Sequence, residues 1–450
     1  MPRQPHEEWD WDPYGFPHPC WTHLLQSFPH VSRQITVALP CMGLDACSHS
    51  LAELGIPFHV EYGFDTHMGL LGPITDLHGP DATGIHLGHC GDILAADISR
   101  WHRVDGVVSG PPCPPWSTIG LQHGWSDVRA QVFMKVTDVI VDQGYKGAYF
   151  FLLEMVEGMA KQQASAKHDL AQDAQPESPH TAWVADLGVR APMWEIHVWK
   201  MNTQSYLPQH RPRLYTVGVN KAMGCHRPKP PLPPPLALRP CLDNIMHPGI
   251  PAIQEDTLSA QHRSNLQAAK ITIQKKVSAT HGDHCQEVWA AVALDRNPDR
   301  TWGVAIRTDG TVATLRTAHS WQWILHWRHG VLRVSRRLHP IEHLTLQGFP
   351  PELARSMSRS EVVRGAGNAC SVPVMGAALA SLLQACPELV HSDSNPSVHL
   401  GQLSEDRPRM RKPSVHGGQL SEDRHRKQKR VEELRTDIAI FQAQCKLLGR

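Results

Sequence analysis

The most constraining feature of this sequence is an apolar run, residues 149–153, that leads directly into the acidic residue Glu154. Five consecutive apolar or aromatic side chains without polar alternation are typical of a β-strand that is buried on both faces. Such strands occur where helices cover both sides of a mostly parallel sheet. The run therefore predicts a central strand of an α/β sheet, with a carboxylate at the end of that strand.

Other apolar segments alternate with helix-like segments over the first half of the chain. The predicted strands are 35–39, 59–64, 104–108, 196–201 and 214–219, and apolar residues at helical spacing occupy 128–140. Strands that alternate with helices favour a mostly parallel sheet with helices on both faces. We therefore expect a doubly wound α/β fold.

Composition limits the classes of protein to which the chain can belong. The 44 Lys and Arg residues balance 43 Asp and Glu, so any nucleic-acid surface must be a local patch. Eleven scattered cysteines without a C-x-x-C pair argue against a secreted disulfide scaffold. The uncharged stretch between Arg364 and Glu388 contains polar residues and a proline, so we expect a packed helix there and no membrane span.

Polar groups with chemical potential stand at three predicted strand ends. They are the turn Gly110-Pro111-Pro112-Cys113, the acid Glu154, and the segment Gln209-His210-Arg211-Pro212-Arg213. In an open parallel sheet, reactive groups collect just past the carboxyl ends of the strands. A thiol at such a place acts as a nucleophile when its thiolate is stabilised. Each group alone also fits an ordinary structural role, but together they indicate a site.

The order of these motifs resembles the cytosine-C5 DNA methyltransferase family. Three further segments match that family: Gly91-Asp92-Ile93, the stretch from Arg336 to Leu346-Gln347-Gly348-Phe349-Pro350 with Glu342 in register, and Gly367-Asn368-Ala369-Cys370-Ser371-Val372-Pro373-Val374. The resemblance covers roughly residues 33–388. It implies a Rossmann-like methyltransferase sheet with a smaller inserted target-recognition domain, and S-adenosylmethionine as the cofactor.

The resemblance also implies a chemistry for the residues at the strand ends. Cys113 would add to C6 of a cytosine that is flipped out of double-stranded DNA, and C5 would then take the methyl group. Glu154 would hydrogen-bond or protonate the ring at N3, and Arg213 would bind O2 with Arg211 beside it. The implied activity is that of a DNA (cytosine-5)-methyltransferase.

Two alternatives remain open for the function. One is a transfer-RNA cytosine-5 methyltransferase of the same fold, and the other is a catalytically inactive DNA-binding or scaffold relative. A family member that acts on transfer RNA carries a Cys-Phe-Thr tripeptide in its variable region. This chain has no such tripeptide, which favours DNA as the substrate.

The same resemblance implies a cofactor site assembled from distant parts of the chain. Its expected members are Gly43 in the first turn, Asp65 with Glu61 as the competing candidate for the ribose, Asp92 and Ile93 near the adenine, and Asn368. The first turn departs from the family pattern Phe-x-Gly-x-Gly-Gly, because Cys41-Met42-Gly43-Leu44-Asp45-Ala46 keeps one glycine. This departure motivates the inactive alternative.

The domain organisation follows from these segments. We expect an irregular lead-in (1–33), a cofactor-binding and catalytic domain (34–219), a target-recognition region (220–335), the remainder of the catalytic domain (336–388), a disordered tail (389–430) and an amphipathic helix (431–450). The target-recognition region is expected to be mostly irregular or β. Its scattered His and Cys residues fit no standard zinc spacing, so we expect no metal.

The tail carries two near-identical 17-residue segments that begin at Pro396 and Pro413. They run into a basic cluster, 424–430, which favours the nucleus as the location, with the cytoplasm as the alternative. Apolar residues at spacings of three and four follow over 431–448. This stripe predicts self-association or docking on a protein partner.

Overall fold

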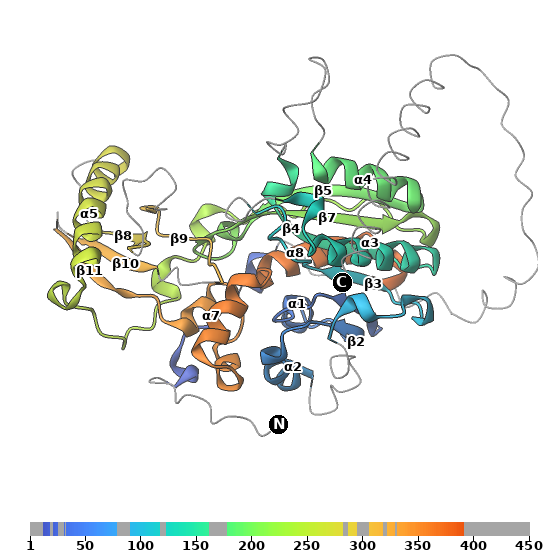
Figure 1. Ribbon diagram of the computed structural model, residues 1–450, viewed down its shortest axis with the longest axis horizontal. Helices are drawn as coiled ribbons and strands as arrows, with labels where there is room; N and C mark the ends of the chain where they lie inside the picture. Colours follow the sequence, from blue (N-terminus) through green and yellow to red (C-terminus); the bar gives the residue numbers. More distant parts are fainter. Residues whose placement is uncertain are drawn as a thin grey trace, which may run out of the picture.

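The computed structural model describes residues 12–18, 21–25, 31, 33–78, 91–117, 123–161, 178–281, 287–294, 306–317, 322–328 and 331–390. The repeat, the basic cluster and the helix expected over 431–448 lie outside the described residues. Figure 1 shows the central sheet towards one end of the molecule's long axis and most of the predicted target-recognition region at the other.

A six-stranded sheet forms the larger part of the molecule. Its strands are β1 Ile35–Pro40, β2 Phe58–Phe64, β3 Gly106–Ser109, β4 Phe150–Val156, β5 Trp194–Asn202 and β7 Pro212–Asn220, in the order β2-β1-β3-β4-β7-β5. β1 pairs in parallel with β2 and β3, and β3 with β4, which confirms the expected α/β sheet. β7 is antiparallel to both of its neighbours, so the sheet is mixed. Two adjacent strands can run parallel only if a long crossover, usually a helix, connects them. The connection from β5 to β7 contains no long helix, so the two strands run antiparallel.

Strand β4 is buried as its apolar run predicts, but it continues past residue 153. β3 pairs with β4 only as far as Leu153, whereas β7 pairs with β4 as far as Val156. Glu154 therefore lies inside the strand, just beyond the end of the neighbouring β3. The extra length is due to β7, which continues to supply backbone hydrogen-bond partners on the other side.

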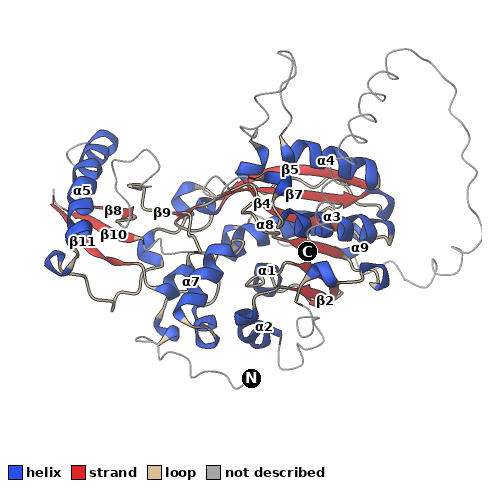
Figure 2. Ribbon diagram, viewed as in Figure 1, coloured by secondary structure: helices blue, strands red, loops and turns tan. Residues whose placement is uncertain are grey.

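Helices cover both faces of the sheet (Figure 2). Helices α3 Ala130–Tyr145 and α4 Pro179–Arg190 share one apolar core with the sheet, and α1 Ala46–Glu53 and α8 Val372–Gln384 share the other. The remaining helices of the catalytic part are α2 Leu71–His78, α6 Pro340–Thr345, α7 Arg359–Asn368 and α9 Pro387–Val390.

Helix α8 packs back on the N-terminal part of the chain. Ser50 of α1 donates a hydrogen bond to the carbonyl oxygen of Val372 at 2.8 Å, and the ring of Trp21 fills the space beside Gly376. Within the described residues, Arg359–Gln384 is the one helical stretch long and apolar enough to cross a membrane. However, 83% of its most apolar window is buried inside the molecule, as in the core helix of a soluble domain.

The region predicted to recognise the target contains a small antiparallel sheet and a long helix. The sheet consists of β8 Glu287–Val292, β10 Trp323–Arg328 and β11 Val331–Arg337, in the order β11-β10-β8. Helix α5, Ala260–His281, packs on it and was not predicted. Its core residues Leu266, Ala269, Ile273 and Val277 do recur at helical spacing, so the signal was present. A short parallel pair, β6 Gln209–His210 and β9 Val312–Ala313, connects this region to the catalytic part.

Candidate active site

The turn that carries Cys113 begins where β3 ends. The backbone N–H groups of Trp116 and Ser117 both donate to the carbonyl oxygen of Cys113 at 3.0 Å, which closes a tight turn after it. The Trp116 ring is buried and packs edge-on against Trp125 and Phe133. Because one end of the turn is anchored by these aromatic rings, the half-buried Cys113 thiol is held at the carboxyl end of the sheet.

Glu154 and Arg213 form an ion pair in the same region. Arg213 Nε lies 2.9 Å from Glu154 Oε1, and the Glu154 side chain is only 3% exposed. The contact has the distance of an ion pair but not the angles of a hydrogen bond, so both atoms keep their hydrogen-bonding capacity. Buried polar atoms of native proteins nearly always find partners. Because these two atoms lack hydrogen-bond partners among the described residues, the pair is suited to bind a polar ligand.

The electrostatic surroundings of Cys113 oppose ionisation of its thiol. Removal from water and the Glu154 carboxylate raise the pKa of Cys113 to about 11, while Arg213 and Arg211 act in the opposite direction. The thiol is therefore protonated at neutral pH in the free protein. Its activation requires that a proton leave as the substrate binds or reacts.

Arg211 lies close to this site, but its guanidinium group binds backbone. It donates to the carbonyl oxygens of Ala369 at 2.8 Å and Gly367 at 3.2 Å, and more weakly to that of Leu315 at 3.4 Å. Burial and the neighbouring Arg213 lower its pKa to about 10. Arg211 thus positions the backbone on both sides of Asn368 and contacts the region predicted to recognise the target.

Two residues near the site were not given a role from the sequence. Gln209 donates through Nε2 to the carbonyl oxygen of Leu346 at 2.8 Å, so it holds the Leu-Gln-Gly-Phe-Pro segment against the strand. Cys370 faces Gly110, because a Cβ atom on Gly110 would lie 2.8 Å from Cys370 Sγ and 3.8 Å from Glu154 Oε2. The sequence did place both residues inside motifs that match the family, Gln209 in the segment 209–213 and Cys370 in the segment 367–374.

A cavity lies beside the catalytic turn, at the carboxyl ends of β1 and β3. It encloses about 380 Å³, including its open mouth, and Gly43 and Asn368 both line it although 325 positions separate them in the chain. Its other lining residues are Leu39, Cys41, Met42, Asp45, Ala46, Cys47, Val108, Ser109, Gly110, Ala369, Cys370 and Met375.

Asp65 hydrogen-bonds to Gly43 in the lining of this cavity, and the turn that carries Asp92 packs on Asp65. Asp65 accepts hydrogen bonds from the backbone N–H groups of Gly43 at 3.0 Å and His67 at 2.8 Å. Gly91 packs so closely on Asp65 that a Cβ atom there would lie 2.5 Å from the Asp65 carbonyl oxygen. Asp92 follows Gly91 directly and accepts from the backbone N–H of Leu94 at 3.0 Å, so its turn lies beside the one that follows β2.

The two other predicted cofactor residues are placed differently. The Ile93 side chain is buried in the core beneath the turn that carries Asp92. Glu61 lies in the middle of β2 and pairs with His59 at 3.5 Å. Of the two acids considered for the ribose, only Asp65 hydrogen-bonds to the first turn.

The first turn adopts left-handed backbone at Gly43 and also at the non-glycine residues Cys41 (φ 66°) and Asp45 (φ 59°). The Asp45 side chain compensates for this conformation. It caps α1 by accepting from the backbone N–H of Ser48 at 3.0 Å, and its other oxygen lies 2.7 Å from His78 Nε2. Aspartate tolerates the left-handed region better than most residues. The turn therefore forms without the second glycine of the family pattern.

Comparison with known proteins identifies the family of this chain. The family model for C-5 cytosine-specific DNA methylase matches residues 85–384. The chain belongs to this family. It is 25% identical over 288 residues to the type II methyltransferase M.NgoBI of Neisseria gonorrhoeae, covering 64% of this chain and 76% of that one. It is 24% identical over 297 residues to M.HaeII of Haemophilus aegyptius, covering 66% and 78%. The solved structure of the Entamoeba histolytica methyltransferase EhMeth covers 78% of this chain and 99% of its own, at 11% identity and a TM-score of 0.48.

As a DNA cytosine-5 methyltransferase, the protein uses S-adenosylmethionine as its methyl donor, so the predicted family, enzyme class and cofactor are confirmed. The cavity fits this cofactor. A Cβ atom on Gly43 would meet no other atom within 4 Å, so the turn leaves room for a ligand there. Carboxylate oxygens such as those of Asp65 and Asp92 accept hydrogen bonds from hydroxyl and amino groups, which S-adenosylmethionine carries. Among the described residues, no group of His, Cys, Asp and Glu side chains is arranged to hold a metal ion.

Proposed function

We propose that this methyltransferase modifies C5 of a cytosine that is flipped out of double-stranded DNA, through a transient covalent bond between Cys113 Sγ and C6. The observation that carries the proposal is the electrostatic influence of Glu154 and Arg213 on the Cys113 thiol, beside the cavity that contains Gly43 and Asn368. A nucleophile, an acid and a cation are thereby combined with a methyl-donor site.

Cys113 begins the reaction. Addition of its sulfur to C6 pushes electron density into the ring, towards N3 and O2, and turns the inert C5 into an enamine carbon. Bound S-adenosylmethionine supplies the methyl group as an electrophile. A base then removes the C5 proton, and the thiolate leaves.

Glu154 and Arg213 stabilise the charge that develops on the ring. Glu154 hydrogen-bonds or protonates N3, and Arg213 binds O2, since cationic donors stabilise negative charge strongly in a pocket with little water. The ion pair holds both groups in place before the base arrives, so little reorganisation is needed during the reaction.

The burial of Glu154 supports base flipping as part of this proposal. The side chain of Glu154 is only 3% exposed, so the edge of a base stacked in a duplex does not reach it. An enzyme that acts on an atom inside the helix extrudes the target nucleotide into its pocket, at a cost of a few kcal/mol in lost stacking and pairing.

A duplex with fluorine at cytosine C5 tests this mechanism, because the fluorine cannot leave as a cation. With S-adenosylmethionine present, we expect a covalent complex on Cys113 that survives denaturation. The Cys113→Ser variant should form no complex, yet it should still bind the duplex. An adduct on another cysteine, or near-normal methylation by Cys113→Ser, contradicts the proposal. Parallel assays with transfer RNA test the substrate class, and absence of cofactor binding and methylation would favour an inactive relative.

A further inference from the structure

A pair of cysteines lies far from the active site. Cys225 follows β7, Cys386 lies between α8 and α9, and their sulfur atoms are 3.2 Å apart although 161 positions separate them in the chain. Cys225 is 8% exposed and Cys386 is fully buried. The backbone N–H of His226 donates to the carbonyl oxygen of Ala385 at 2.7 Å, so the two chain segments are directly joined beside the sulfurs.

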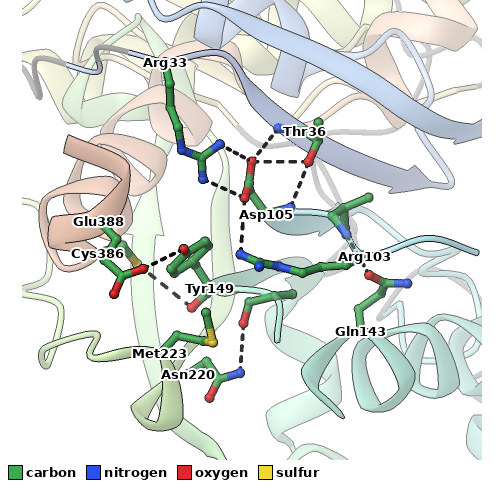
Figure 3. A network of polar contacts seen from close by, with 12 residues as sticks. Arg33, Thr36, Arg103, Asp105, Gln143, Tyr149, Asn220, Met223, Cys386 and Glu388 are labelled. Carbon is green, nitrogen blue, oxygen red and sulfur yellow. Dashed lines mark hydrogen bonds and ion pairs between the residues drawn. The ribbon is translucent and has the colours of Figure 1, made fainter. Parts of the chain in front are cut away.

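The surroundings place this pair at the amino-terminal end of strand β4, whereas Cys113 lies at the carboxyl ends of the strands. Both sulfurs approach the carbonyl oxygen of Tyr149, Cys225 at 3.6 Å and Cys386 at 4.0 Å. Tyr149 directly precedes β4, whereas Glu154 lies near its other end. Figure 3 shows Cys386 beside Tyr149, whose hydroxyl donates to Glu388 at 2.8 Å.

The two thiols differ in their tendency to ionise. Their shared hydrogen bond lowers the pKa of Cys225, helped by the backbone at Asn220, and raises the pKa of Cys386. Thiolates, not thiols, react with oxidants. Cys225 is also the less buried of the two, so it is the residue that meets an oxidant first.

We propose that Cys225 and Cys386 form a reversible disulfide when the protein is exposed to a peroxide. The Cys225 thiolate attacks one peroxide oxygen to give a sulfenic acid, and the second oxygen leaves as hydroxide, which becomes water. The Cys386 sulfur then attacks the sulfenic acid, the S–S bond forms and a second water leaves. Two protein thiols are oxidised and one hydrogen peroxide is reduced to two waters.

The disulfide would join the start of the target-recognition region to the end of α8. It would enclose that region together with the segment that carries Asn368 in one covalent loop. Links between residues far apart in sequence constrain the unfolded chain most. Because the pair lies away from Cys113, its oxidation stabilises the protein without occupying the catalytic thiol.

Mass spectrometry of the full chain tests this proposal. Purified protein is treated with hydrogen peroxide, its remaining thiols are alkylated under denaturing conditions, and linked peptides are mapped before and after reduction. We expect one peptide pair that joins Cys225 to Cys386 and disappears on reduction. The oxidised protein should unfold about 5 °C or more above the reduced protein, since the closed loop is long.

Variants separate this pair from the other cysteines. Cys225→Ala and Cys386→Ala should each abolish the linked peptide and the rise in unfolding temperature, while methylation under reducing conditions shows that they are folded. Cys241→Ala, which removes an exposed thiol, should change neither result. The proposal is wrong if both thiols stay fully alkylatable in wild-type protein after peroxide, or if either one pairs with a different cysteine.

Discussion

Arg213 Nε lies 2.9 Å from Glu154 Oε1 as a diagonal neighbour across the antiparallel pairing of β4 with β7. The register sets Glu154 opposite Tyr215 and Val156 opposite Arg213, so the two charged side chains share one face of the sheet. Because β7 runs antiparallel to β4, Arg213 at the start of β7 lies next to Glu154 near the end of β4. Both side chains act on the nearby Cys113 thiol, whose pKa Glu154 raises and Arg213 lowers.

Replacement of Glu154 by Gln should reduce methyl transfer far more than DNA binding. The amide keeps the shape of the side chain but supplies neither the proton nor the charge, and such general acid–base help is worth about 10²–10⁴-fold in rate. Single-turnover methylation and duplex affinity of the same preparation check this. Equal losses in both would mean that Glu154 is only structural.

The reactivity of Cys113 should depend strongly on pH. Its pKa is raised to about 11, so the thiolate fraction in the free protein grows about tenfold per pH unit from pH 7 to pH 10. Alkylation of Cys113 by iodoacetamide, followed by mass spectrometry, should rise accordingly. Glu154→Gln removes a negative charge that raises this pKa, so it should speed alkylation at pH 8. A rate that is already at its plateau at pH 8 in the wild-type protein contradicts the prediction.

Substitution of Gly110 by Ala should weaken the site through a steric conflict with Cys370. The added methyl group would lie 2.8 Å from Cys370 Sγ, closer than real contacts allow, and overpacking of this kind costs about 1–3 kcal/mol. The matched double variant, Gly110→Ala with Cys370→Ala, removes the clash and should recover most of the lost activity and stability. Failure of the rescue would show that Gly110 is needed for another reason.

The Asp45–His78 pair should maintain the cofactor turn that lacks its second glycine. Asp45→Ala removes the cap of α1, which costs about 1 kcal/mol, and leaves a left-handed residue without compensation. Asp45→Gly loses the same contacts but adopts the left-handed backbone freely. Calorimetry without DNA should therefore show weaker S-adenosylmethionine binding for Asp45→Ala than for Asp45→Gly. Equal S-adenosylmethionine affinities of the two variants would show that the left-handed conformation of residue 45 does not affect cofactor binding.

The tail should be dispensable for chemistry. Deletion of 391–450 is expected to leave methylation of short duplexes nearly intact, because every predicted site residue lies before it. If the basic cluster 424–430 directs nuclear import, the deletion should also shift a fluorescently tagged protein towards the cytoplasm. A large loss of turnover would assign the tail to the catalytic unit. Leu434→Asp, assayed for self-association and for partner binding, tests the stripe over 431–448 separately.

The sequence by itself determined the strands of the six-stranded sheet, helix α3 and the order of the motifs. Burial on both faces requires an apolar run such as 149–153, and a helix that packs on a sheet needs apolar residues at its own period, so both signals are local. Helix α5 shows the limit of such signals. It packs on the small sheet of its own region through one narrow stripe, and the rest of its surface is mostly polar, with Ile271 exposed.

Only the tertiary structure decided what individual site residues contact. Arg211 donates to carbonyl oxygens of residues more than 100 positions away, and backbone carbonyls leave no trace in a sequence pattern. The first turn suggested a damaged cofactor site, because one glycine remains of three. The folded chain supplies His78 from α2 as the partner of Asp45, which supports a left-handed residue that would otherwise be strained. Side chains far apart in sequence compensate for local departures, and only the fold brings them together.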